Sequence, residues 1–509
     1  MFKNKPAVVI TGFCLLNLIL HLIADANTGF QGDELLHIET GNHPAWGYME
    51  FPPMIGWLAF MQNQFHSSSV FVHHIFTHLA SIGIIILVGL TTLELGGKTK
   101  AVFIALLCLA IAPGFDRGGQ LFQPVVFSQL FWVLSFYQWV RLTKTSNRKY
   151  LLYLTLSITL GFLAKYDILF FGVGLIGGLF FKKTREVFLT KSIWKYKLLF
   201  LVLVGPNLWW EYKHQFPVLN MFSRLYETQL DHLTVAGVLK ELIIALNPLA
   251  AVIWIGGLVF MFNKTDKAFY RPLAVSIVIS VLALAVSKSK AYYFFPVVLT
   301  LLPFGATWFE QKILARGRTW ILYPTAALML LSGVALTPYG MGILPPAAFL
   351  KYAHVKKEDG HYHFAFDCQE YFSRQKWDNT LTALREVYDS LPPAEQQSCL
   401  IWGKHYSQAG AVNLMGQTYG LPAAFSYHGS FYLWAPPAGE MPHTVIAFTN
   451  DEAGIDFFQG FFGSVIPVKR VFNPYAMFDK DLWQTIYICK DPKQNFAGMK
   501  AAFKARVFE

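Results

Sequence analysis

Long apolar runs separated by short polar segments fill the first two thirds of the chain. Several of these runs are shorter than the roughly 20 residues that a helix needs to cross a bilayer, so their ends must lie in the flanking segments. The pattern predicts about eleven transmembrane helices within residues 1–336. The runs occur at residues 6–24, 70–93, 101–115, 121–140, 151–164, 168–181, 198–210, 244–262, 273–287, 291–309 and 319–336.

The pattern changes in residues 337–509, where short apolar runs alternate with polar positions. Thr444–Thr449 and Thr485–Cys489 read as buried strands, and a helical stretch at 379–390 precedes a strand-like run at 398–402. Alternating helices and strands are typical of an α/β domain. The sequence therefore predicts a membrane domain at 1–336 and a soluble α/β domain at 337–509.

Basic residues decide the expected orientation. With a cytoplasmic N-terminus, the inner segments up to residue 336 hold 20 Lys and Arg residues and the outer segments hold seven. Cytoplasmic loops carry such an excess, so the α/β domain is expected outside the cell membrane. Hydrophobic residues make up 54% of the chain, the mean hydropathy is +0.38 and the net charge is +11. The positive charge thus marks topology, and no nucleic-acid partner is predicted.

Three of the five cysteines lie in the outward domain, where an oxidising compartment permits a disulfide. We predict a bond between Cys368 and Cys399, with Cys489 buried in a strand. Cys14 and Cys108 fall in apolar runs and are expected to act as small apolar residues.

The first outer loop, residues 25–69, is acidic and contains no Lys or Arg. Asp25 and Glu39 are expected only to solvate it. Asp33 and Glu34 differ, because an adjacent carboxylate pair near a membrane surface can serve as a general base or a metal anchor. Solvation of the loop is the simpler alternative for this pair as well.

Four cations lie at the outer ends of later apolar runs, where the positive-inside rule disfavours them: Arg117, Lys165, Lys288 and Lys290. Each alone could be an interfacial anchor whose side chain reaches toward water. Together, opposite an acidic loop, they indicate a site for an anionic group such as a phosphate. By contrast, the G-x-G-x-x-G string at Gly172–Gly177 lies inside an apolar run, which favours tight helix packing over nucleotide binding.

Several motifs occur in an order that resembles the bacterial branch of the GT-C glycosyltransferases, which includes dolichyl-phosphate-mannose protein mannosyltransferases and the lipid A aminoarabinose transferase. They are Asp33-Glu34, Glu50-Phe-Pro-Pro53, Leu163-Ala-Lys-Tyr166, Pro206-Asn207 and Lys288-Ser-Lys-Ala-Tyr-Tyr293. The resemblance covers most of residues 1–310. Two positions depart from it: Phe51 stands where the aminoarabinose transferases have Lys, and Gln123-Pro124 stands where many relatives have Asp.

The resemblance implies a GT-C fold in the inner (plasma) membrane and a hexosyl- or pentosyltransferase. The donor would be a polyprenyl-phosphate sugar, and the acceptor a lipid such as lipid A or lipopolysaccharide, another glycan or a protein. Asp33 would be the catalytic base and Glu34 its orienting neighbour, with any divalent metal held by this pair. The remaining implied residues are Arg117, Lys165, Lys288 and Lys290 for the donor phosphate, and Glu50, Tyr166, Tyr292 and Tyr293 for the substrate.

A transporter or lipid flippase is the main alternative, since it also needs many spans and charged groups. Transporters usually place ionisable residues near the bilayer midplane and often have repeated halves. Here the charges lie at the outer rim and no internal repeat is evident. The segment 403–411 resembles parts of the same relatives, and packing or acceptor binding would both explain it.

Overall fold

The computed structural model describes residues 5–189, 192–263, 267–315, 317–450 and 454–508. Contacts divide the chain into two units. We call them the helical unit, formed by Met1–Ile23, Phe51–Met54 and His74–Ile343, and the α/β unit, formed by Ala24–Glu50, Ile55–His73 and Leu344–Glu509. This division differs from the expected boundary at 336/337 because most of the first outer loop belongs with the C-terminal segment.

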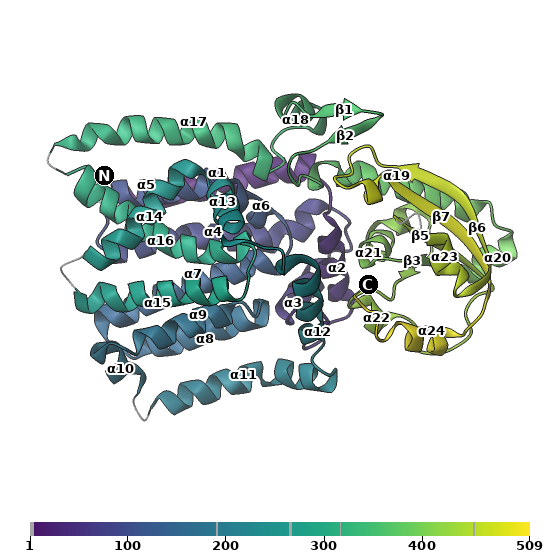
Figure 1. The fold of residues 1–509 in the computed structure, drawn as a ribbon, viewed down its shortest axis with the longest axis horizontal. Coiled ribbons are helices and arrows are strands. Elements are labelled where there is room, and N and C mark those ends of the chain that lie inside the picture. Colours follow the sequence, from purple (N-terminus) through teal and green to yellow (C-terminus); the bar gives the residue numbers. More distant parts are fainter. Residues whose placement is uncertain (1–4, 190–191, 264–266, 316, 451–453, 509) are drawn as a thin grey trace. The chain divides into compact units, whose positions relative to one another are not determined.

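Each of the predicted apolar runs coincides with a helix or a bent helix pair (Figure 1). Among the described residues, five helices are long and apolar enough to cross a membrane, or up to seven if each bent pair counts as one span. The other runs form shorter or more polar helices. The helices that lie wholly or mainly in the helical unit are α1 (Lys5–Asn27), α4 (Val70–Glu94), α5 (Thr99–Ala110), α6 (Pro113–Gln120), α7 (Pro124–Thr145), α8 (Lys149–Ala164), α9 (Ile168–Gly178), α10 (Lys182–Phe188), α11 (Ile193–Lys213), α12 (Pro217–Leu225), α13 (Val235–Ala245), α14 (Pro248–Asn263), α15 (Lys267–Val286), α16 (Phe295–Trp308) and α17 (Leu322–Gly340).

Proline sets the two sharp bends of the helical unit. The chain turns by 71° between α5 and α6 and by 112° between α13 and α14. Pro113 is the first residue of α6 and Pro248 the first residue of α14. Proline lacks the N–H that would continue the preceding helix but is compatible with the first turn of a new one. Each run therefore breaks into two helices at its proline.

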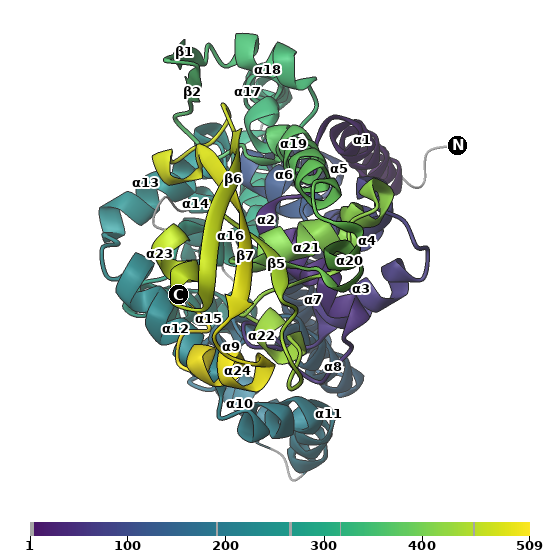
Figure 2. The same ribbon diagram turned by 90° about the vertical axis from the view of Figure 1, so that its right-hand side faces the viewer.

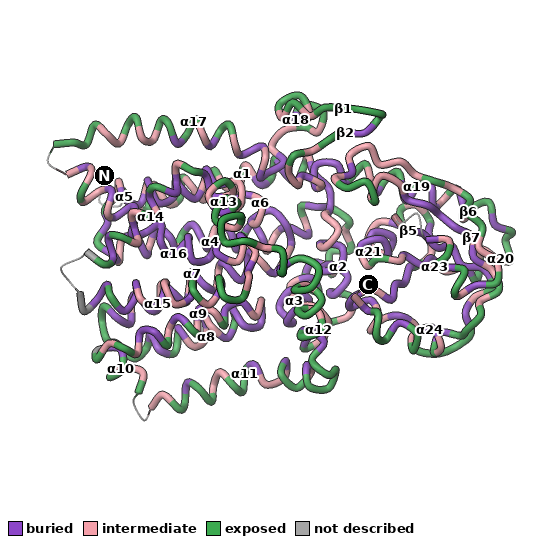
Figure 3. Tube along the Cα trace, viewed as in Figure 1, coloured by how far each residue is buried: buried purple, intermediate pink, exposed green. Residues whose placement is uncertain are grey.

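Burial separates an inner helix from outer ones in the helical unit. In the span Ala291–Ile313, which contains α16, 83% of the residues of the apolar window are buried, against 17% in the spans of α1 and α17. Figure 3 shows long exposed stretches along α17. Exposed helices that are apolar all round need an apolar solvent, which the bilayer provides.

Two of the three glycines of the G-x-G-x-x-G string, Gly174 and Gly177, lie where α9 packs against α15. A Cβ on Gly174 would lie 2.1 Å from Oγ of Ser280, and one on Gly177 would lie 2.4 Å from the side chain of Ile279. The string therefore allows close approach of two helices, which confirms the packing interpretation.

The α/β unit contains a five-stranded sheet in the order β4-β3-β5-β7-β6 and a hairpin of β1 and β2. Strands β4, β3 and β5 are parallel, whereas β7 is antiparallel to both β5 and β6 (Figure 2). The predicted strands lie in β3, β5 and β7, and the predicted helix lies in α19. The elements of this unit are α2 (Gly32–Glu39), α3 (Met54–Asn63), α18 (Pro346–Tyr352), β1 (Lys356–Glu358), β2 (His361–His363), α19 (Glu370–Asp389), α20 (Pro393–Ser398), β3 (Leu400–Gly403), α21 (Tyr406–Met415), β4 (Ala424–Phe425), α22 (Phe431–Trp434), β5 (Thr444–Thr449), α23 (Gly454–Gln459), β6 (Phe462–Phe472), β7 (Trp483–Pro492) and α24 (Phe496–Phe503).

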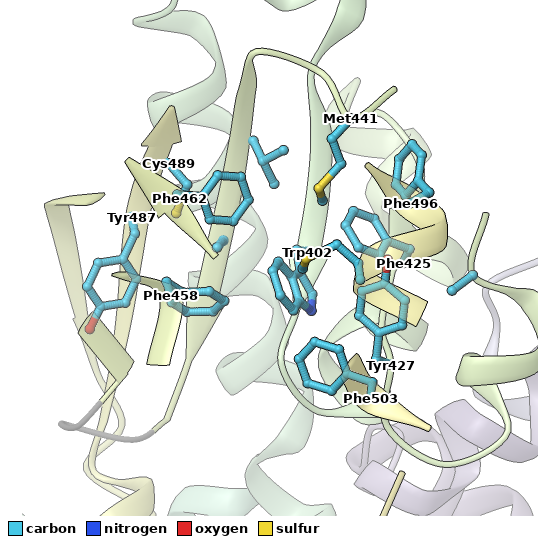
Figure 4. Packing of buried hydrophobic residues seen from close by; sticks show 14 residues of the cluster. Trp402, Phe425, Tyr427, Met441, Phe458, Phe462, Tyr487, Cys489, Phe496 and Phe503 are labelled. Atoms are coloured by element: carbon cyan, nitrogen blue, oxygen red, sulfur yellow. The ribbon is translucent and has the colours of Figure 1, made fainter. Parts of the chain in front are cut away.

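Trp402 of β3 is the centre of the core of the α/β unit. Its ring lies within 6.0 Å, between centroids, of rings from β4, α23 and α24. Figure 4 shows Phe458 on one side of the indole and Phe425, Tyr427 and Phe503 on the other. Aromatic pairs of this kind add about 0.5–1.5 kcal/mol each beyond the area that they bury. The core therefore anchors β3, and with it the loop that follows this strand.

The predicted disulfide between Cys368 and Cys399 is wrong, because all five cysteines are free. The twenty residues of α19 separate the two thiols along the chain. A helix of that length spans about 30 Å, whereas a disulfide needs Cα atoms within roughly 7 Å. The third thiol, Cys489, is buried in β7 as predicted.

Candidate active site

Asp33 lies in the first turn of α2. The side-chain oxygen of Gln31 accepts a hydrogen bond from the backbone N–H of Asp33 (2.7 Å), and the Glu34 carboxylate accepts one from the backbone N–H of Gln31 (2.8 Å). This capping box satisfies N–H groups that a helix start otherwise leaves unpaired. Glu34 is fully buried, so its carboxylate stabilises the start of the helix and thereby the position of Asp33.

The Asp33 carboxylate is held by Tyr406, the first residue of α21. The Tyr406 hydroxyl donates a 2.6 Å hydrogen bond to Oδ1 of Asp33, across 373 positions of the sequence. Close packing of α2 on α21 makes this possible, since a Cβ on Gly410 would lie 2.9 Å from a carbonyl oxygen of α2. The tertiary structure thus joins the first outer loop to the C-terminal segment at the candidate base.

The expectation that Asp25 and Glu39 only solvate the loop is wrong, because both are buried. Glu39 accepts hydrogen bonds from Asn413 of α21 (3.1 Å) and from Asn42 (3.0 Å). These donors offset the cost of removing the carboxylate from water. Glu39 is therefore part of the α2–α21 contact.

Glu50 is held by Ser430 at the start of α22. Its Oε1 accepts from the backbone N–H of Ser430 (2.8 Å), and its Oε2 accepts from the hydroxyl (2.5 Å). Burial raises the pKa of Glu50 to about 7, further raised by the charge of Asp33 and opposed by the hydrogen bonds from Ser430. Gly429 beside it has φ +59°, and a Cβ there would lie 2.1 Å from Oε1 of Glu50. Only glycine fits that position without displacing the carboxylate.

Two histidine rings pack against the side chain of Tyr406. The Tyr406 ring stacks on His428, with centroids 4.9 Å apart and planes at 27°, and His405 lies 3.9 Å from it. Burial lowers the pKa of His428 to about 4, with a smaller effect from Lys404, so this imidazole is uncharged near neutral pH. The rings hold the phenol in place without adding charge to the site.

The loops that carry these groups leave the carboxyl ends of two neighbouring parallel strands. His405 and Tyr406 follow β3, while His428 and Ser430 follow β4. After β4 the chain crosses to the other side of β3 to form β5. The carboxyl ends of strands at such a change of direction are the usual ligand site of α/β sheets.

A solvent-open pocket of about 420 Å³ adjoins the start of α2. Gln31 and Gly32, the two residues before Asp33, form part of its wall, together with Lys376, Tyr475 and Asp481. Burial lowers the pKa of Lys376, while the charge of Asp481 acts in the opposite direction. The pocket thus places polar and aromatic groups next to the candidate base.

In the helical unit, Lys165 follows α8 and lies among tyrosines. Its ammonium group is 4.0 Å from the ring centroid of Tyr293 and 5.0 Å from that of Tyr292. It also forms a 3.2 Å ion pair with Asp167, which accepts a 2.6 Å hydrogen bond from Ser128. The structure therefore brings three of the predicted residues together and adds a carboxylate that compensates the lysine charge.

The other predicted residues of the helical unit occupy separate places. Lys288 forms a 2.7 Å ion pair with Asp231, and Lys290 donates to the side-chain oxygen of Gln229. Arg117 is half-buried in α6. The Tyr166 hydroxyl contacts side-chain oxygens of α11, on Asn207 and on Glu211, at 3.0 Å each.

Asp33 and Glu34 each have one carboxylate oxygen bound by a protein donor. Oδ1 of Asp33 accepts from Tyr406, whereas Oε2 of Glu34 accepts from the backbone N–H of Gln31 at the helix start. We therefore assign no metal ion to this pair.

Tyr406, His428 and Ser430 were not predicted as site residues. One signal was available in the sequence: the polar segment 403–411 follows a predicted buried strand, and loops after such strands carry sites in α/β domains. No local pattern links this segment to a loop almost four hundred residues earlier.

Comparisons with known proteins agree with the fold. Residues 50–210 match the family model of dolichyl-phosphate-mannose-protein mannosyltransferases. A comparison with curated protein sequences found no match. The crystal structure of ArnT from Cupriavidus metallidurans bound to undecaprenyl phosphate is similar at a TM-score of 0.56 and 13% identity, over 94% of this chain and 97% of that one. Its apo state gives the same TM-score at 12% identity, also over 94% and 97% of the two chains.

The arabinofuranosyltransferase AftD from Mycobacteria is similar at a TM-score of 0.50 and 11% identity, over 94% of this chain and 41% of that one. The helical architecture and these likenesses define a multi-pass membrane protein with the GT-C fold. The mannosyltransferase model matches only residues 50–210, within the first half of the chain, so the comparisons show the fold and a partial family match.

Proposed function

We propose that the protein transfers a sugar from a polyprenyl-phosphate donor to a hydroxyl group of an extracytoplasmic acceptor, with Asp33 as the general base. One observation carries the assignment. Oδ1 of Asp33 is held by Tyr406, while Oδ2 accepts no hydrogen bond from any residue that the structure describes. A carboxylate that is fixed through one oxygen and open at the other can accept a proton from a substrate hydroxyl.

The reaction balances with this single base. The acceptor oxygen attacks the anomeric carbon, and its proton passes to Oδ2 of Asp33. The bond between the anomeric carbon and the phosphate oxygen breaks, and polyprenyl phosphate leaves with the electron pair. Basic groups that offset the charge on the leaving phosphate would lower the barrier. We assign this role to Arg117, Lys165, Lys288 and Lys290.

Lys165 is the phosphate ligand that the geometry of the helical unit supports best. Its position against Tyr292 and Tyr293 restricts the side chain, and Asp167 keeps it charged. ArnT, which shares the fold, is crystallised with undecaprenyl phosphate, and this supports a lipid-phosphate donor here. Tyr166, Tyr292, Tyr293 and Glu50 are proposed to bind the rest of the substrate.

The pocket beside α2 offers room for the acceptor. Pockets that bind small molecules combine apolar walls with a few polar groups. The pocket here has both kinds of wall and includes Gln31 and Gly32, which directly precede Asp33. We therefore propose that the acceptor glycan or headgroup enters the site from this pocket.

The proposed location is the inner (plasma) membrane with the α/β unit outside. The excess of Lys and Arg in the inner segments supports this orientation. A membrane-impermeant thiol reagent on intact cells should label cysteine at position 356, which is exposed in the α/β unit, but not at position 148, which is exposed between α7 and α8. The reverse labelling would overturn the orientation.

The function is tested by incubating purified protein with radiolabelled polyprenyl-phosphate sugars and following release of the sugar to water or to membrane glycans. Turnover of at least one donor should depend on Asp33. Asp378→Asn is the matched control, because Asp378 also accepts a hydrogen bond from a tyrosine but lies exposed on α19. Movement of intact lipid across vesicles without sugar release would favour a flippase instead.

A further inference from the structure

We propose that Tyr406 of the C-terminal segment is a positioning residue for the catalytic base: its phenol fixes Asp33 Oδ1 and thereby the orientation of the carboxylate. The inference rests on the proposed function and adds a role for the α/β fold in the chemistry. It follows from the geometry of the contact, from the way the phenol is held, and from the kind of donor that it is.

The contact is short and specific. The 2.6 Å separation between the Tyr406 hydroxyl and Oδ1 of Asp33 lies in the range of hydrogen bonds to ionised carboxylates. An ionised carboxylate can only accept, so the phenol must be the donor. The bond fixes Oδ1 and so orients Oδ2, the oxygen proposed to accept the proton.

Three features keep the phenol in this position. Tyr406 opens α21, whose start is capped by a reciprocal pair of hydrogen bonds between His405 and Gln408. The ring stacks on His428. A Cβ on Gly429 would lie 3.3 Å from the Tyr406 ring, so the absence of a side chain there leaves the ring its space. Asp33 therefore meets a donor that is already oriented.

The choice of donor matters chemically. A lysine or arginine at position 406 would also bind Asp33, but its positive charge would make the carboxylate a weaker base. A neutral phenol orients the carboxylate and leaves it negatively charged. The nearby Glu50 is held in the same manner by the neutral groups of Ser430. Asp33 and Glu50 are thus both positioned by uncharged donors from loops that follow parallel strands.

The test is Tyr406→Phe, with Tyr419→Phe as the matched control. Tyr419 donates a 3.1 Å hydrogen bond to Asp378 at the surface, so its loss removes the same kind of contact away from the site. Hydrogen bonds to charged groups contribute about 1.5–3 kcal/mol, which corresponds to roughly a 10- to 150-fold fall in kcat for sugar release. Affinity for undecaprenyl phosphate, used as the binding probe, should change little.

The split between kcat and KM separates positioning from a merely structural role. In Tyr406→Phe the loss should appear in kcat, while the KM for the donor changes little, because a misoriented base affects the transition state and not donor binding. Tyr419→Phe should leave both constants in place. A loss confined to KM, or no fall in kcat at all, would overturn the inference.

A double-variant cycle covers the case in which Tyr406→Phe loses stability. In an Asp33→Asn background, Tyr406→Phe should cost little further activity, because nothing remains to be positioned. A second loss as large as that in the wild type would mean that Tyr406 acts on the fold alone. If Asp33→Asn itself stays active, both the base and its positioning residue are wrong. If only Tyr406→Phe keeps the wild-type kcat, the base stands and this inference fails.

Discussion

Two candidate carboxylates of the α/β unit and two candidate lysines of the helical unit have different kinds of partner. In the α/β unit, Asp33 and Glu50 are held by neutral donors, the phenol of Tyr406 and the hydroxyl and N–H of Ser430. In the helical unit, Lys165 and Lys288 are held by carboxylates at 3.2 Å and 2.7 Å. A neutral partner orients a charge and leaves it available for chemistry, whereas an opposite charge orients it and compensates it.

The kind of partner decides how available each candidate residue is to a substrate. A lysine at the outer end of an apolar run draws attention as a phosphate ligand, but a paired lysine binds phosphate only in competition with its carboxylate. A carboxylate with a phenol as its partner has no such competitor. The acidic loop is therefore the stronger candidate for the chemistry, and the lysines are candidates for binding.

The largest expected effect is that of Asp33→Asn. Loss of a positioned general base should reduce sugar transfer by at least ~10²-fold, while donor binding and expression stay near wild type. Single-turnover kinetics with a radiolabelled donor provide the measurement. Near wild-type transfer would move the search for the base to Glu50, whose carboxylate shares the loop.

A smaller effect is expected for Lys165→Met, which should weaken both donor binding and turnover. A phosphate ligand acts in the ground state and the transition state alike, and one charge-assisted contact contributes about 1.5–3 kcal/mol. Binding of undecaprenyl phosphate to the purified protein should fall by roughly tenfold or more.

Lys144→Met is the matched control for Lys165, because Lys144 also forms an ion pair, at 2.9 Å with Glu94, but lies exposed. Lys165→Met leaves the charge of Asp167 without its partner, which could itself weaken donor binding. The double variant Lys165→Met with Asp167→Asn removes that charge, so donor affinity that stays low in the double variant reflects the loss of the lysine as a ligand. Full donor affinity in Lys165→Met would remove this lysine from the site.

The raised pKa of Glu50 can be tested by comparing how the stability of the wild type and of Glu50→Gln depends on pH. Because the native pKa is about 7 and the ordinary value is 4.5, the folded protein keeps a proton that the unfolded chain releases between these values. The wild type should therefore lose stability as pH rises through this window, by roughly 1–3 kcal/mol, and Gln at this position should not. Thermal unfolding at pH 4.5, 6 and 8 provides the comparison.

The difference in Tm between Glu50→Gln and the wild type should grow with pH up to about 7 and then level off. Glu395→Gln is a useful contrast, because Glu395 is only partly buried and its pKa is lowered by Thr444 and Lys490. A constant difference at every pH would show that burial does not raise the pKa of Glu50.

The smallest expected effect is that of a reducing agent. Since all five thiols are free, dithiothreitol should not change the Tm of the purified protein. Loss of a native disulfide typically costs 2–5 kcal/mol, so a clear drop under reducing conditions would contradict the free thiols. Mass spectrometry of alkylated peptides would identify the cysteines involved.

The sequence by itself determined the helices and the core strands. Every apolar run became a helix or a bent pair, and Thr444–Thr449 became a strand with all six residues buried. These features depend on the period of hydrophobic residues along a short stretch, which is visible without a partner. The acidic loop and its candidate Asp33 could be recognised in the same way, because residues 25–69 contain several carboxylates and no Lys or Arg.

Only the tertiary structure decided the partners of those residues. In the folded chain, Glu34 caps the start of α2 and Glu39 is buried. Lys165 pairs with Asp167, and Tyr406 donates a hydrogen bond to Asp33. The fold also keeps the cysteines apart. A hydrogen bond acts over about 3 Å and depends on both groups, so a pattern in one segment cannot name its distant partner. The packing of α2 on α21 supplies that information, and with it the assignment of a base and its positioning residue.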